Sequence, residues 1–177
     1  MKVKKEEGFT LIELLIVVAI ISIIAAIAVP GLLRARMTGN ESSAIASLRT
    51  TTSSQVSYSA ACGNGAYATS YDILADAPPG GGQGFISAEF NLADPIVKSG
   101  YNLRMTSGAA GASTVLDCNT LATGAGFYAT ADAVGAGTTG TRGFGVDQNM
   151  TIFQDTTDGT TVPTQPFTTG GAVSPIQ

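Results

Sequence analysis

The feature that most constrains this chain is an uncharged, apolar segment close to its amino terminus. No charged residue lies between Leu14 and Leu33, and most side chains in that interval are aliphatic. At 1.5 Å per residue, these roughly twenty residues form about 30 Å of helix, which matches the hydrocarbon core of a bilayer. The segment is therefore predicted to be a helix that can span a membrane.

One carboxylate, Glu13, lies at the amino-terminal end of this apolar helix. Insertion of an acid at the centre of a membrane helix costs about 2.5–3.5 kcal/mol on insertion scales. A buried Glu13 therefore requires a cationic partner. A second interpretation places Glu13 at headgroup depth, where water solvates it. The helix itself is aliphatic on every face, so it is stable either in lipid or in a bundle of its own copies.

Charge and composition exclude several classes of function. The chain has 9 basic and 13 acidic residues, and beyond the amino-terminal lysines its basic residues form no cluster except Arg34 and Arg36. This balance argues against nucleic-acid binding. The chain has no histidine, which excludes His-based metal sites, Ser-His-Asp triads and Cys-His dyads. We therefore expect neither enzyme activity nor a cofactor.

The periodicity beyond the apolar segment predicts an α+β fold. A second helical pattern follows Asn40, with one apolar or small face formed by Ile45, Leu48, Thr52, Val56 and Ala60. Apolar and polar residues then alternate over 101–106, 127–133, 144–146 and 150–152, with a tight turn at Gln148 and Asn149. We predict that a long amino-terminal helix, hydrophobic and then amphipathic, packs on a four-stranded antiparallel sheet.

The two cysteines, Cys62 and Cys118, are predicted to form a disulfide outside the cytoplasm. Two buried free thiols are the alternative. Asp147, Asp155 and Asp158 are weak candidates for a calcium site, because carboxylates on loops suit that ion. Scattered aspartates of this kind are more often solvated turn residues, so we expect no metal.

The segment before the apolar helix is short and basic, and it ends in Gly8 followed by Phe9. The sequence MKVKKEEG followed by FTLIELLIVVAIISIIAAIAVPGLLRAR resembles the class III leader and amino-terminal helix of type IV pilins and pseudopilins. This resemblance covers about the first fifty residues. In this family both cysteines commonly lie in the last third of the chain, an arrangement from which this sequence departs.

The resemblance implies how the chain is processed and assembled. Prepilin peptidase would cut between Gly8 and Phe9, and the new amino group of Phe9 would be N-methylated. The mature chain would wait in the lipid of the inner membrane until the assembly machinery packs it with its own copies into a filament. Glu13 would then pair with the amino group of a neighbouring Phe9 and set the axial register of the subunits.

Pro30 and Gly31 are expected to bend or partly melt the helix around residues 26–31. In the family that this chain resembles, a stretch near the matching proline melts as the filament forms. The alternative is that Pro30 marks the membrane exit and kinks an intact helix.

These expectations divide the chain into six segments: a leader (1–8), a transmembrane or filament-core helix (9–36), an amphipathic helix half (37–62), an irregular connecting loop (63–99), an antiparallel sheet (100–155) and an extended carboxyl-terminal tail (156–177). The predicted function is that of a structural subunit of a type IV pilus, which serves adhesion or motility at the cell surface. A minor pilin or a type II secretion pseudopilin is the first alternative. A monomeric, membrane-anchored periplasmic binding domain is the alternative from another class.

Overall fold

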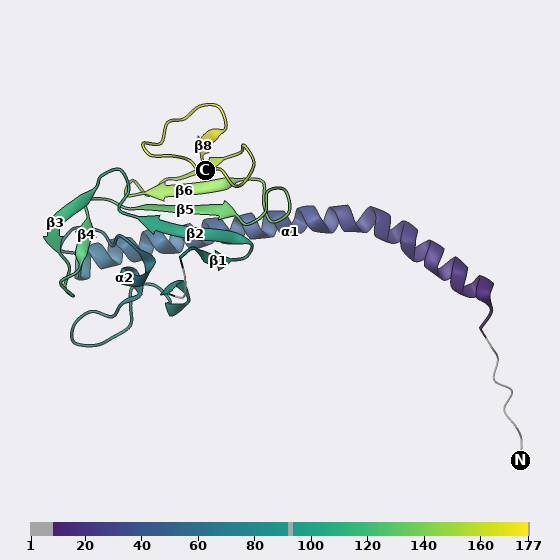
Figure 1. Ribbon diagram of the computed structural model, residues 1–177, viewed down its shortest axis with the longest axis horizontal. Helices are drawn as coiled ribbons and strands as arrows, with labels where there is room; N and C mark the ends of the chain where they lie inside the picture. The colour runs from purple at the N-terminus through teal and green to yellow at the C-terminus, as the bar shows by residue number, and fades with distance from the viewer. Residues whose placement is uncertain (1–8, 92–93, 177) are drawn as a thin grey trace, which may run out of the picture. The chain divides into compact units, whose positions relative to one another are not determined.

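The computed structural model describes residues 9–91 and 94–176 (Figure 1). The predicted leader, including Gly8, lies outside the described residues. The chain divides into two compact units, residues 1–36 and residues 37–177. One helix, α1 (Leu11–Ala61), contributes to both units, and all of the strands belong to the second.

The second unit contains a six-stranded antiparallel sheet with the order β1-β2-β5-β6-β7-β8. Its strands are β1 (Ile96–Lys98), β2 (Tyr101–Thr106), β5 (Tyr128–Ala133), β6 (Gly143–Asp147), β7 (Ile152–Asp155) and β8 (Val173–Pro175). A separate two-stranded sheet consists of β3 (Ala112–Leu116) and β4 (Ala122–Gly124). The α+β class is confirmed, with the long helix packed on antiparallel strands.

The predicted number of four strands is wrong, because the main sheet has six. The four predicted strands correspond to β2, β5, β6 and β7, which form its centre. The additional strands β1 and β8 lie at the two edges and have three residues each. Strands this short show no readable alternation, and β8 also contains Pro175, which is tolerated at a sheet edge.

Two short helices and one edge strand interrupt the region between α1 and β2. These are α2 (Tyr71–Ala75), the 3₁₀ helix η1 (Ala88–Asn91) and β1. Leu74 of α2 and Phe90 of η1 are buried in the core. This connection therefore contributes to the core instead of only crossing the surface.

The buried face of α1 differs from the predicted stripe. Leu48 and Thr52 are buried as expected, but Val56 is 44% exposed and Ala60 is also exposed. The buried face instead includes polar side chains, above all Gln55, which is completely buried. Gln55 fits there because its amide donates to the carbonyl oxygen of Ala68 at 2.8 Å and accepts from the Ala68 N–H at 3.0 Å.

The turn between β6 and β7 is tight, as predicted, but Met150 belongs to it. The Met150 N–H donates to the Asp147 carbonyl at 2.9 Å, and Met150 has φ 63. Its side chain is 45% exposed. The expectation that Met150 is an inward-facing strand residue is therefore wrong, because a left-handed residue here closes the turn.

The carboxyl-terminal segment covers the outer face of the sheet, and β6 is consequently buried on both faces. A Cβ atom built on Gly143 would lie 2.0 Å from the Thr161 carbonyl oxygen, so only glycine permits this approach. Pro163 is completely buried, and its carbonyl accepts a hydrogen bond from the Tyr128 hydroxyl. Beyond this cover, β8 pairs with β7.

Candidate functional site

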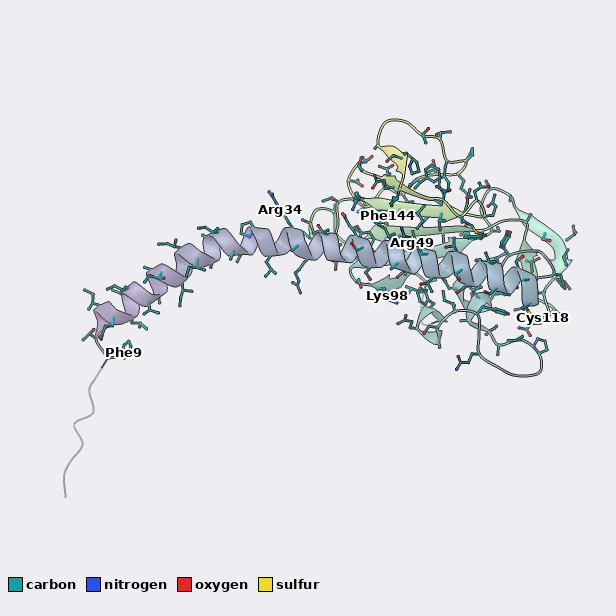
Figure 2. The ribbon with its side chains drawn as sticks, turned by 180° about the vertical axis from the view of Figure 1, so that it is seen from behind. Phe9, Arg34, Arg49, Lys98, Cys118 and Phe144 are labelled. Carbon is teal, nitrogen blue, oxygen red and sulfur yellow. A yellow bond between two sulfur atoms is a disulfide. The ribbon has the colours of Figure 1, made fainter. Side chains whose placement is uncertain are left out.

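The apolar helix of the first unit leaves its large side chains uncovered. Every large apolar residue from Phe9 to Leu33 is at least 47% exposed, and Figure 2 shows side chains projecting around this part of α1. Within the described residues, α1 is the one helix that is long and apolar enough to cross a membrane. Ser22 does not break this surface, because its hydroxyl donates to the Val18 carbonyl at 2.7 Å.

Glu13 takes part in a capping box at the start of α1. The Glu13 N–H donates to the Thr10 hydroxyl at 3.3 Å, while the Glu13 carboxylate accepts from the Thr10 N–H at 2.9 Å and from its hydroxyl at 2.5 Å. Two otherwise unpaired amides of the first turn are thereby satisfied. Both bonds to the carboxylate use Oε2, so Oε1 accepts no hydrogen bond from residues 9–91 or 94–176.

Pro30 and Gly31 lie inside α1, which is helical on both sides of them. A Cβ atom on Gly31 would meet nothing within 4 Å, so no neighbouring contact in this chain requires a glycine there. Local melting at residues 26–31 stays a prediction about the assembled state.

Cys62 and Cys118 form a disulfide whose Cα atoms are 4.8 Å apart. It connects the chain just after α1 to the turn between β3 and β4, where the Cys118 N–H also donates to the Cys62 carbonyl at 2.8 Å. Beside it, the Tyr58 hydroxyl donates to the Asp117 carboxylate at 2.7 Å. Burial and this hydrogen bond raise the pKa of Tyr58, which keeps its hydroxyl protonated as a donor.

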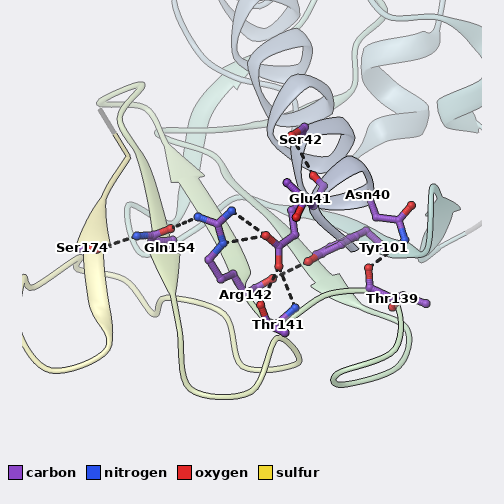
Figure 3. A network of polar contacts seen from close by, with 10 residues as sticks. Asn40, Glu41, Ser42, Tyr101, Thr139, Thr141, Arg142, Gln154 and Ser174 are labelled. Atoms are coloured by element: carbon purple, nitrogen blue, oxygen red, sulfur yellow. Dashed lines mark hydrogen bonds and ion pairs between the residues drawn. The ribbon is translucent and has the colours of Figure 1, made fainter. Parts of the chain in front are cut away.

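A polar network fixes α1 to the sheet at the beginning of the second unit (Figure 3). Glu41 is 5% exposed, and its Oε2 accepts from Arg142 Nη2 at 2.6 Å and from Nε at 2.9 Å. Its Oε1 accepts from the Thr141 N–H at 2.9 Å and from the Thr141 hydroxyl at 3.0 Å. Burial alone would raise the pKa of Glu41, but these hydrogen bonds and the charge of Arg142 together lower it.

The network extends on both sides of this pair. Arg142 donates through Nη1 to Gln154 at 2.8 Å, and Gln154 donates to the Ser174 hydroxyl at 3.1 Å, which reaches β7 and β8. On the other side, the Asn40 amide donates to the Thr139 carbonyl at 2.9 Å. The start of the buried half of α1 is therefore joined directly to the β5–β6 loop, and through Arg142 and Gln154 to β7 and β8.

The three aspartates considered for calcium do not converge. Asp147 bonds to Asn149 and Gln165, Asp155 bonds to Thr157, and Asp158 bonds to Thr160 and Thr161. No group of three or more His, Cys, Asp or Glu residues in the described part of the chain could hold a metal ion. Each carboxylate instead stabilises a turn.

Sequence reasoning missed the capping box and the Glu41 network. The capping box has a readable signature, because Thr10-Leu11-Ile12-Glu13 fits the pattern Ser/Thr-x-x-Glu. The network has none, because Glu41 and Arg142 are 101 residues apart and no local pattern indicates that they meet.

Comparisons with known proteins match the amino-terminal region. Residues 3–29 match the family described as the prokaryotic N-terminal methylation motif. Over 38 residues the chain is 58% identical to the type IV wide pilus major component PilA4 of Thermus thermophilus. This stretch covers 22% of the chain and 29% of that relative. No solved structure matches the chain.

Proposed function

We propose that this chain, whose amino-terminal region is that of the type IV pilin family, is a structural subunit of a type IV pilus filament on the cell surface. One observation carries the proposal: the large apolar side chains from Phe9 to Leu33 are all exposed. Such a surface is unstable in water and must be covered by lipid or by other apolar helices. The prepilin motif over residues 3–29 supports other apolar helices, in place of lipid, as the final environment of this surface.

Assembly then amounts to an exchange of one apolar environment for another. The helix first spans the inner membrane, and the assembly machinery moves it into a bundle formed by the same helix of other copies. Because aliphatic side chains gain little from either environment over the other, this transfer meets no large solvation barrier. The second unit would remain outside the bundle, on the filament surface, where it serves adhesion or motility.

Glu13 would supply the register of the bundle. Prepilin peptidase cleavage between Gly8 and Phe9 creates an amino group, which is then methylated and remains cationic. Oε1 of Glu13 is free to accept from the amino group of a neighbouring Phe9 while Oε2 keeps its bonds to Thr10. A charge buried in an apolar bundle strongly favours the one arrangement in which it is paired.

The first experiment isolates filaments and weighs their subunit. Surface material is sheared from cells that express the chain, imaged by cryo-electron microscopy, and analysed by intact-protein mass spectrometry. We expect fibres built from many copies of a chain that begins at methylated Phe9. An intact segment 1–8 in the fibres would contradict the proposed processing. Absence of this chain from the fibres, or its presence in only a few copies, would contradict the role as the main subunit.

The second experiment separates the two roles of Glu13. Glu13→Gln retains a side chain that can complete the capping box but removes the charge, whereas Thr10→Ala weakens the capping box and retains the charge. If the charge sets the register, Glu13→Gln abolishes filaments and Thr10→Ala reduces them only slightly. The proposed register role fails if Glu13→Gln assembles at the wild-type level. Membrane levels of each variant are measured by immunoblot, so that loss of filaments is not confused with loss of the subunit.

A further inference from the structure

A cavity of about 290 Å³ lies in the second unit, between the β6–β7 turn and the segment around residues 165–167. It is independent of the apolar helix and of the Glu41 network. Its lining is mainly apolar, with several polar side chains at one side. A concave, mainly apolar surface with a few placed polar groups is the general form of a small-ligand site.

The apolar side of the cavity is aromatic. Phe153 and Phe167 stack with ring centroids 4.5 Å apart and planes inclined by 26°. Behind them, the ring centroid of Tyr128, the first residue of β5, lies 5.9 Å from that of Phe167. Phe153 and Phe167 are both partly exposed. Their rings are negative on the face and attract the weakly positive C–H groups of a ring-shaped ligand.

The polar side of the cavity is held in place by Asp147. Its carboxylate accepts from the Asn149 N–H at 2.9 Å and from the Asn149 side-chain amide at 3.2 Å, and it also receives the Gln165 amide at 3.4 Å. These bonds leave Asn149 Oδ1 unused. The Thr151 hydroxyl also makes no hydrogen bond within the described residues, and both side chains are on the exposed turn. The turn therefore presents one fixed acceptor and one hydroxyl next to the aromatic rings.

The charge of the lining restricts the ligand further. Asp147 is the one charged residue among the described residues that line the cavity, and neither Lys nor Arg is present there. An anionic ligand would therefore meet a carboxylate without compensation. Asp147 is itself 5% exposed and already receives three hydrogen bonds from neutral donors, so it offers little to a free cation. The lining selects a neutral ligand with hydroxyl groups.

We propose that this cavity binds a neutral pyranose ring, such as the terminal sugar of an uncharged glycan. The C–H face of the sugar packs on the outer face of one ring of the stacked Phe153–Phe167 pair, and its hydroxyls bond to Asn149 Oδ1 and to the Thr151 hydroxyl. Asp147 is a positioning residue that fixes Asn149 and does not contact the sugar. This role adds ligand binding to the filament function and does not depend on assembly.

Saturation-transfer NMR on the full chain tests the proposal. The protein is held in phosphocholine micelles, because glycoside detergents would compete. The probes are methyl β-D-galactopyranoside and methyl β-D-glucopyranoside, compared with glucuronate as an anion and n-butylammonium as a cation. We expect saturation of the ring C–H protons of at least one glycoside and none of either ion. Absence of transfer to both glycosides, or equal transfer to either ion, would overturn the proposal.

Three variants place the binding at this cavity. Thr151→Ala removes the free hydroxyl and should weaken glycoside binding about fivefold to tenfold, which is the loss of one hydrogen bond. Asn149→Ala should weaken it at least as much. Ala109→Leu fills the cavity from an exposed position and should abolish binding. This variant tests the site independently of Asn149→Ala, which also affects the turn. Thr114→Ala, on exposed β3, is the matched control. Unchanged binding in Thr151→Ala and Ala109→Leu would refute the site.

Discussion

The Glu41 carboxylate and the Arg142 guanidinium meet at 2.6 Å across 101 residues of sequence. Glu41 is the more deeply buried partner, since its side chain is 6% exposed while that of Arg142 is 34% exposed. The pair joins the helix that carries the apolar segment to the sheet of the second unit. Because each Glu41 oxygen receives two donors, removal of its charge affects four hydrogen bonds at once.

Glu41→Gln should therefore destabilise the second unit substantially. A neutral amide cannot accept all four bonds, and it leaves the half-buried Arg142 charge without its partner. We expect a loss of about 2–3 kcal/mol of unfolding free energy, or about 5–10 °C in Tm. Thermal denaturation of the full chain in micelles, followed by circular dichroism, measures this. Glu89→Gln breaks the exposed ion pair with Lys98 and should cost less than about 1 kcal/mol. Equal losses in the two variants would contradict the larger stabilising contribution of Glu41.

The contribution of Glu41 should also depend on pH. Its pKa is lowered in the folded chain, so the carboxylate is ionised in the folded state at pH values where it is already protonated in the unfolded one. The resulting stability is fully present above the ordinary carboxyl pKa of about 4.3 and is lost as the pH falls through the lowered folded value. The difference in Tm between wild type and Glu41→Gln should therefore shrink steadily below about pH 4. A difference that stays constant down to about pH 3 would rule out this linkage.

The sequence alone predicts best what is encoded locally. The apolar helix follows from an unbroken aliphatic composition, and β2 and β5 follow from alternation over six residues each. The register confirms that alternation, since Leu103 pairs with Ala131 and Ala129 pairs with Val146, and all four are buried. These patterns are visible because each is repeated within one element.

The remainder depends on contacts between distant segments. Val56 was expected in the core and Gln55 was not, because polarity alone does not reveal that Ala68 supplies two hydrogen bonds to the Gln55 amide. The edge strands β1 and β8 form because neighbouring strands offer unpaired backbone groups, which is a property of the assembled sheet. The cavity beside the β6–β7 turn has the same origin, because residues near 109, 150 and 166 meet only in the folded unit.

Substitutions at Gln55 and Val56 directly test which of the two side chains contributes to the core. Gln55→Met keeps the size of the side chain but leaves the N–H and the carbonyl of Ala68 buried without partners. We expect a loss of about 2–4 kcal/mol, measured by denaturant unfolding, together with faster hydrogen exchange at the Ala68 amide. The adjacent Val56→Ala removes apolar surface, but from an exposed position, and it should change stability by no more than about 0.5 kcal/mol. A larger effect at Val56 than at Gln55 would mean that the buried face of α1 is wrongly placed.

Removal of the disulfide should lower the unfolding free energy and loosen one region in particular. The disulfide closes a loop of 56 residues, for which the chain-entropy model gives about 4 kcal/mol as an upper figure. The double variant Cys62→Ser, Cys118→Ser should lose much of that amount. The β3–β4 sheet pairs with no strand of the main sheet, so amide exchange should accelerate most at residues 112–124 and least in β5 and β6.

Reduction of the wild-type chain is the matched control for this variant. Dithiothreitol should reproduce its loss of stability and its exchange pattern, and it should change nothing further in the double variant itself. If exchange instead accelerates uniformly through the six-stranded sheet, the disulfide supports the whole second unit and not the β3–β4 region. That result would also indicate that the Tyr58 bond to Asp117 cannot hold the end of α1 without the covalent link.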